Sequence, residues 1–115
     1  MKKFILKELK SFKCAFNGIY LALTEAHIII QIMATVLVIA TGYYQNINKT
    51  EWLIIAICIA MVIGAEMMNT AIEKTVDYIS MEQHPQAKSI KDISAGAVLV
   101  ISIVAAIIGI NILFL

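Results

Sequence analysis

Three long apolar segments dominate the chain, at residues 28–44, 52–72 and 93–115. The third has Ser94, Ser102 and Asn111 as its only polar side chains, and residues 52–65 of the second have none. A helix needs about 20 residues to cross a hydrocarbon core of about 30 Å. We therefore expect three membrane-spanning helices, at residues 28–46, 52–72 and 93–115. A water-soluble bundle of buried helices is the alternative, but the third segment lacks the polar face that such a helix turns to water.

Residues 1–25 have a different pattern. Apolar side chains recur there at spacings of three and four, at Phe4, Ile5, Leu9, Phe12, Phe16, Ile19, Tyr20 and Leu23. Five lysines fall between them, which predicts a basic amphipathic helix lying in the plane of the lipid headgroups. Packing against the chain's own membrane helices is an alternative that is compatible with the first. The fold class we expect is all-α: an N-terminal amphipathic surface helix and three transmembrane helices, in one membrane domain over residues 1–115.

Composition narrows the class of protein. The 115 residues are 61% apolar and 15% charged, whereas soluble domains are about 45–50% apolar and about 25% charged. This excludes a disordered or nucleic-acid-binding tail, and the length excludes a two-lobed kinase or a large transporter. All nine basic residues are lysines, so no arginine is present to clamp a phosphate. Cys14 and Cys58 form no CxxC motif or Cys/His cluster, so neither a disulfide framework nor a zinc site is indicated.

The lysines also predict the orientation in the membrane. Five of them precede the first apolar segment, and Lys74, Lys88 and Lys91 flank the connection between the second and third. The short connection at residues 45–51 contains only Lys49. The positive-inside rule places the N-terminus and the longer connection in the cytoplasm.

A stripe of polar residues crosses the end of the second apolar segment. It consists of Glu66, Asn69, Glu73 and Asp77, which on a helix fall within an arc of about 80°. A carboxylate inside a membrane helix costs about 2.5–3.5 kcal/mol, so Glu66 is a candidate functional residue. Three carboxylates on one stripe repel each other unless a divalent cation, neighbouring lysines or protons neutralise them.

Other polar residues are expected at the same cytoplasmic level. Glu25 and His27 precede the first span, and Lys91 and Asp92 precede the third. Carboxylate and amide oxygens suit magnesium, which is usually shared with substrate phosphates, and lysine neutralises phosphate oxygens. These are the groups that phosphoryl transfer needs. The simpler interpretations are a solvated helix end at residues 73–77, an ordinary loop histidine at His84 and an inter-helix hydrogen bond from Gln31.

One motif makes the chain resemble a known family. The stretch from Glu66 to Asp77 reads ExxNxxxExxxD, and Lys91-Asp92 and residues 94–98 (Ser-Ala-Gly-Ala-Val) follow it. This is similar to the signature of the small bacterial integral-membrane diacylglycerol kinases, a family that includes the undecaprenol kinases. The resemblance covers nearly the whole chain.

The resemblance implies an ATP- and Mg²⁺-dependent kinase that phosphorylates the hydroxyl of a membrane lipid alcohol. It implies a multi-pass homotrimer in the bacterial cytoplasmic membrane, with composite sites between subunits and ATP and lipid as its partners. Glu66 matches the general base and Asn69 supports it. Two residues are expected to bind both the metal and ATP, Glu25 and Glu73. Four more are expected to contact ATP: Glu82, His84, Lys91 and Asp92. The lipid is expected to contact Glu66, Gln31 and Ala95. The role of Asp77 stays open, and Gln31 stands where some members have an acid.

The lipid and the function class have alternatives. Residues 84–88 (His-Pro-Gln-Ala-Lys) look like the loop of undecaprenol-type members more than the Ser-Gly-Arg-Ala-Lys loop of enterobacterial diacylglycerol kinases. We therefore favour undecaprenol, with diacylglycerol close behind. A non-catalytic accessory membrane subunit or a small cation transporter are the rival functions. The nearly pure apolar character of residues 54–63 and 98–108 disfavours a conduit.

Overall fold

The computed structural model describes residues 1–79 and 84–115, and these form four helices and no strand. The helices are α1 (Lys2–Ala22), α2 (Ala26–Tyr44), α3 (Lys49–Ile79) and α4 (Pro85–Phe114). The last three are each long and apolar enough to cross a membrane. The prediction of an all-α protein with an N-terminal helix and three membrane-length helices is therefore confirmed. Helices α3 and α4 both continue past their apolar segments toward the connection that joins them.

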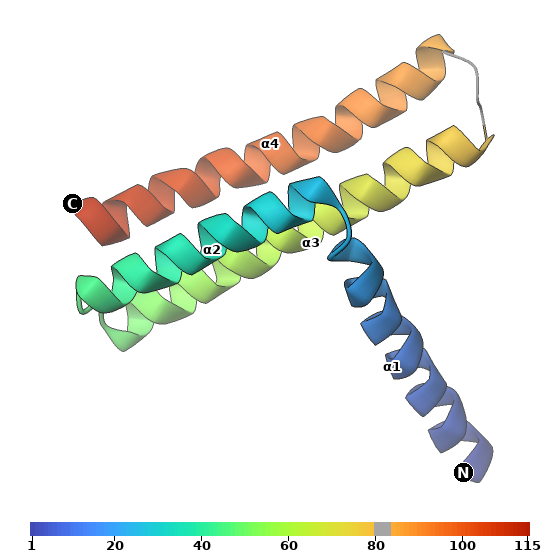
Figure 1. Cartoon of the computed structure of the whole chain (residues 1–115), viewed down its shortest axis with the longest axis horizontal. Coiled ribbons are helices and arrows are strands. Elements are labelled where there is room, and N and C mark those ends of the chain that lie inside the picture. Colours follow the sequence, from blue (N-terminus) through green and yellow to red (C-terminus); the bar gives the residue numbers. More distant parts are fainter. Residues whose placement is uncertain (80–83) are drawn as a thin grey trace.

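The three long helices run side by side, and α1 turns away from them (Figure 1). Helix α3 packs mainly against α4, and α2 packs on α3. Thr24 Oγ1 donates a 2.6 Å hydrogen bond to the carbonyl of Leu21, just where α1 ends. Residues 1–21 are all exposed, so the rest of this chain leaves most of the apolar surface of α1 uncovered. Such a helix is suited to a lipid interface.

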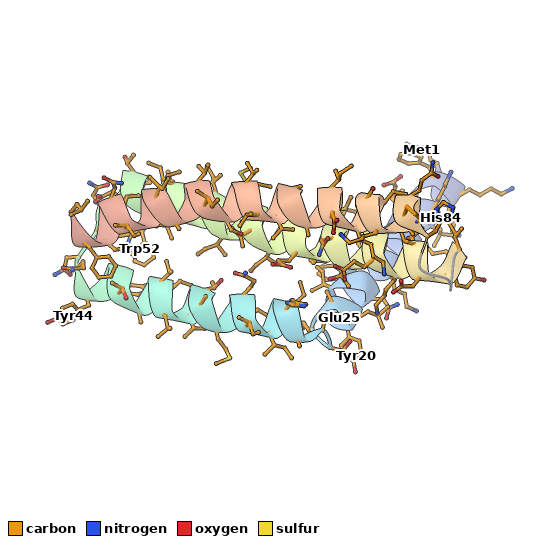
Figure 2. All side chains as sticks on the ribbon, turned by 90° about the horizontal axis from the view of Figure 1, so that it is seen from above. Met1, Tyr20, Glu25, Tyr44, Trp52 and His84 are labelled. Atoms are coloured by element: carbon orange, nitrogen blue, oxygen red, sulfur yellow. The ribbon has the colours of Figure 1, made fainter. Side chains whose placement is uncertain are left out.

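Hydrogen bonds stabilise the α2–α3 turn, at the end of the bundle where Tyr44 and Trp52 lie (Figure 2). Asn46 adopts a φ of 52°, a left-handed conformation that asparagine tolerates. Asn48 and Glu51 then begin α3 with reciprocal hydrogen bonds of 2.9 and 3.0 Å between side chain and backbone. Gln45 Nε2 donates to the carbonyl of Leu113 at 2.9 Å, which joins this turn to the end of α4.

Very little apolar surface is buried within one chain. Among the described residues the buried apolar side chains are Ile28, Ile55, Val76 and Leu113. Large apolar side chains are exposed along every helix. Contiguous apolar surface of this kind marks contact with lipid or with another protein. Together with the three membrane-length helices, it makes this a multi-pass membrane protein.

Candidate active site

The polar stripe of α3 lies on one unbroken helix. Glu66, Asn69, Glu73 and Asp77 all fall within Lys49–Ile79, and at 1.5 Å per residue the stripe is about 16 Å long. Glu66, Asn69 and Glu73 are partly buried, whereas Asp77 is exposed. The stripe thus runs from between the helices to the open end of the bundle, the end toward which His84 lies in Figure 2.

Glu66 meets a polar partner from the neighbouring helix. Gln31 Nε2, on α2, donates to Glu66 Oε1 at 3.5 Å, and the contact is partly buried. The distance is at the long end for a hydrogen bond, so this bond orients the carboxylate but holds it weakly. The simpler interpretation of Gln31, as an inter-helix hydrogen-bonding residue, therefore describes what it does in this structure.

Asn69 connects the stripe internally. Its Nδ2 donates to Glu73 Oε1 at 3.1 Å, one helical turn further along α3. Within the described part of the chain, Asn69 Oδ1 is buried and has no hydrogen-bond partner. Leaving a buried acceptor unsatisfied is unfavourable, so this oxygen is ready to accept from a group that the free chain does not supply.

Glu25 lies opposite the same part of α3. It is the N-cap residue of α2, but its side chain makes no capping hydrogen bond. Its Oε1 instead lies 2.6 Å from Nζ of Lys74, and the two side chains are 31% and 67% exposed. A carboxylate is favourable at this position because the N-terminus of a helix carries partial positive charge.

Lys91 and Asp92 form ion pairs with two different residues. Lys91 forms an ion pair with Asp77 across the α3–α4 hairpin. Asp92 forms its ion pair with Lys88, at 2.7 Å and one turn earlier in α4. The hydrogen bond that Lys88 donates to Asp92, and then the negative charge of Asp92, raise the pKa of Lys88, which precedes the apolar stretch of α4. Adjacent residues point about 100° apart on a helix, so the two members of the pair serve different contacts.

The remaining predicted residues lie apart from these contacts. His84 is the N-cap of α4, where its Nδ1 accepts from the backbone N–H of Gln86 at 3.1 Å, and Pro85 occupies the first helical position. Ala95 is exposed, on the turn of α4 that follows Lys91. Glu82 lies outside the described residues.

The donor set fits a metal shared with substrate. In the described part of the chain no three Asp, Glu, His or Cys side chains gather into a protein-only cage. Glu25 lies at the start of α2 beside Lys74 of α3, and Glu73, the residue before Lys74, is held by Asn69 on the same helix. Magnesium is commonly held by one or two carboxylates, with phosphates and water completing its octahedron. A carboxylate such as Glu25, at the end of the bundle near the α3–α4 connection, fits that description.

An apolar groove lies beside this polar end, between the last turns of α1 and residues 64–74 of α3. Its volume is about 580 Å³, and small side chains of α1 face Met67, Met68 and Ala71 of α3. Glu25 and Lys74 also line it. A second cavity, of about 240 Å³, lies among α2, α3 and α4 and has Gln31 in its lining. Apolar space therefore adjoins the charged pair Glu25–Lys74 in the groove and the neutral Gln31 in the second cavity.

Comparison with known proteins identifies the family. Residues 13–113 match the family model described as prokaryotic diacylglycerol kinase. The chain belongs to this family. It is 41% identical over 101 residues to the undecaprenol kinase of Bacillus subtilis, a stretch that covers 87% of this chain and 82% of that protein. It is 34% identical over 90 residues to a diacylglycerol kinase of Pseudomonas aeruginosa, covering 77% and 68% of the two chains. A diacylglycerol kinase of Synechocystis is 33% identical over 103 residues, covering 88% of this chain and 59% of that one.

Membership confirms the resemblance read from the motif at Glu66–Asp77 and makes this protein an enzyme. Undecaprenol kinases and diacylglycerol kinases both transfer phosphate to a lipid alcohol, so this family member is a lipid kinase.

Sequence reasoning missed two contacts at the site. The sequence indicates only the positive charge of Lys74, and it leaves the role of Asp77 open. Both are charged residues of the last turns of α3, and both pair with a predicted site residue of another element. The available signal was their position beside Glu73 and at the end of the stripe, but spacing within one helix does not identify a partner on another.

Proposed function

We propose that this chain uses ATP and magnesium to phosphorylate a membrane lipid alcohol at the cytoplasmic face, with undecaprenol as the preferred substrate. The observation that carries the proposal is the stripe of α3, because it joins a partly buried carboxylate, Glu66, to an exposed charged rim. A lipid hydroxyl at the membrane boundary can react with a nucleotide in water only where polar side chains connect the two environments, as this stripe does.

The choice of undecaprenol is supported by two features of the sequence, both of which report lineage. The relative named undecaprenol kinase is 41% identical to this chain, whereas the two relatives named diacylglycerol kinase are 34% and 33% identical. The His-Pro-Gln-Ala-Lys sequence at residues 84–88 also resembles undecaprenol-type members. The apolar groove between α1 and α3 is suited to the hydrocarbon chain of either lipid.

In the proposed reaction Glu66 accepts the proton of the lipid hydroxyl. The hydroxyl oxygen then forms a bond to the γ-phosphorus of ATP, while the bond between this phosphorus and the β–γ bridging oxygen breaks and ADP leaves. Gln31 orients the Glu66 carboxylate and, with Ala95, lies beside the lipid. Lys91 neutralises phosphate oxygens, and His84 and Asp92 contact the nucleotide. Since phosphoryl transfer depends mostly on positioning and charge neutralisation, a short chain suffices.

Glu25 and Glu73 would hold the magnesium, and Asn69 fixes Glu73 through the 3.1 Å hydrogen bond. The bound metal would neutralise phosphate charge as the transition state forms. Asn69 Oδ1 remains free to accept a hydrogen bond from a bound group.

The orientation and assembly are part of the proposal. The lysine distribution favours a cytoplasmic N-terminus and a cytoplasmic α3–α4 connection in the inner membrane. The family resemblance supports a homotrimer, and the apolar surface that one chain leaves exposed would be available for contact with other copies or with lipid.

The test is phosphate transfer by the purified full chain in mixed micelles. Labelled ATP is supplied with undecaprenol or diacylglycerol at equal mole fraction, with and without Mg²⁺. We expect magnesium-dependent labelling of lipid, faster with undecaprenol. No transfer to either lipid would refute the kinase proposal, and faster transfer to diacylglycerol would reverse the substrate order. Crosslinking in the same micelles should give trimers.

A further inference from the structure

The ion pair between Lys74 and Glu25 involves a residue that the proposed function gives to the metal. Lys74 Nζ lies 2.6 Å from Glu25 Oε1, and the contact joins α3 to the start of α2. Given the proposed role of Glu25, we propose that Lys74 is a resident cation that competes with the divalent metal for this carboxylate. Lys74 thereby sets the metal concentration that the enzyme requires.

The geometry makes the competition direct. Lys74 is adjacent in sequence to Glu73, the second expected ligand, and Glu73 is already held by Asn69 at 3.1 Å. A divalent metal held by Glu25 would use the same carboxylate that the Lys74 ammonium now contacts. Two cations that contact one carboxylate repel each other, so the ammonium has to leave Glu25 as the metal binds.

The solvent exposure of the two side chains determines how strong this competition is. Lys74 is 67% exposed and Glu25 is 31% exposed, so water screens the pair substantially. An exposed ion pair of this kind is expected to change the dissociation constant of a competing cation by a factor of about two to five. Lys74 can therefore be displaced by a dication, yet it raises the concentration at which displacement occurs. An ion pair that served only to fix the α1–α2 junction would leave metal affinity unchanged, or lower it when broken.

Metal affinity in charge variants is the first measurement. The full chain in detergent is titrated with Mn²⁺, alone and with a non-hydrolysable ATP analogue, and free Mn²⁺ is followed by electron paramagnetic resonance. We expect Lys74→Gln to lower the apparent dissociation constant about twofold to fivefold, because the competing charge is gone. Lys74→Arg keeps the charge and should match the wild type. Lys49→Gln makes the same change at the opposite end of α3 and should have no effect.

A second measurement uses the wild-type chain and so does not depend on how a variant folds. Acetylation of lysines by an amine-reactive reagent is read residue by residue by mass spectrometry, with and without Mg²⁺ and the ATP analogue. Metal should raise the labelling of Lys74 relative to Lys49, because Lys74 is released from Glu25. In Glu25→Gln, Lys74 should be reactive under both conditions.

The outcomes separate this inference from the proposed function. If the wild type binds no Mn²⁺ under either condition and phosphorylates no lipid, the proposed function fails. If the wild type binds Mn²⁺ and Glu25→Gln weakens that binding, the metal site stands. In that case an unchanged or weaker affinity in Lys74→Gln, or no rise in Lys74 labelling on metal addition, overturns the role of Lys74 alone.

Discussion

Replacing Glu66 by glutamine should move stability and turnover in opposite directions. The side chain keeps its shape, and its remaining Oε1 still accepts from Gln31 Nε2, which lies 3.5 Å from the present carboxylate. Packing between α2 and α3 is therefore preserved. The charge disappears from a helix that is long and apolar enough to cross the membrane.

The expected gain in stability follows from the position of Glu66. An ionised side chain at the centre of a membrane helix costs about 2.5–3.5 kcal/mol. Glu66 is only partly buried and has one polar partner, so we expect about half of that penalty, or about 1–2 kcal/mol, to be recovered. If Glu66 is the general base, turnover should fall about 10²- to 10⁴-fold, which is about 3–5 kcal/mol in the barrier.

Two assays on one preparation measure the two effects. Unfolding by dodecyl sulfate in mixed micelles gives the free energy of unfolding, and labelled ATP with lipid gives kcat. Nucleotide affinity should change little, since Glu66 lies about 10 Å along α3 from Glu73, the predicted ATP contact on that helix. Glu51→Gln is the matched control, because it removes a carboxylate at the other end of α3 and retains an acceptor oxygen for the backbone of Asn48.

The reasoning would be refuted by a Glu66→Gln variant that retains more than a tenth of wild-type kcat. It would equally fail if this variant were less stable than the wild type, because the carboxylate would then have a structural role. A loss of nucleotide binding would place Glu66 among the nucleotide contacts instead.

Two further predictions concern packing and the exposed rim. Gly42→Ala should destabilise the chain, since its new Cβ would lie 2.7 Å from the Trp52 ring and such overpacking costs about 1–3 kcal/mol. Gly109→Ala has nothing within 4 Å and should be neutral or stabilising in the same unfolding assay. At the rim, Lys91→Gln should raise KM for ATP more than Asp77→Asn does. The double variant should show coupling of about 0.2–1 kcal/mol, as expected for an exposed pair, and strict additivity would contradict their contact.

Local sequence patterns were sufficient for the helices. Each apolar segment satisfies its own backbone hydrogen bonds when it is helical, so length and hydropathy predict it without reference to any partner. The same local reasoning predicted the stripe, because residues three and four apart share a face wherever the helix lies. It also predicted α1 as a separate element from spacing alone. The motif from Glu66 to Asp77 then indicated the family, which the comparisons confirmed.

The partners of those polar groups were decided only by the tertiary structure. The hydrogen bond between Gln31 and Glu66 joins residues 35 positions apart, and the Lys74–Glu25 ion pair joins α3 to the start of α2. Helical spacing determines which residues share a face, but it does not determine how far one helix is rotated or shifted against another. That rotation depends on the packing of all the side chains between the helices. The sequence alone therefore determined which charges this enzyme has and on which helix face they lie, and the packing decided which of them meet.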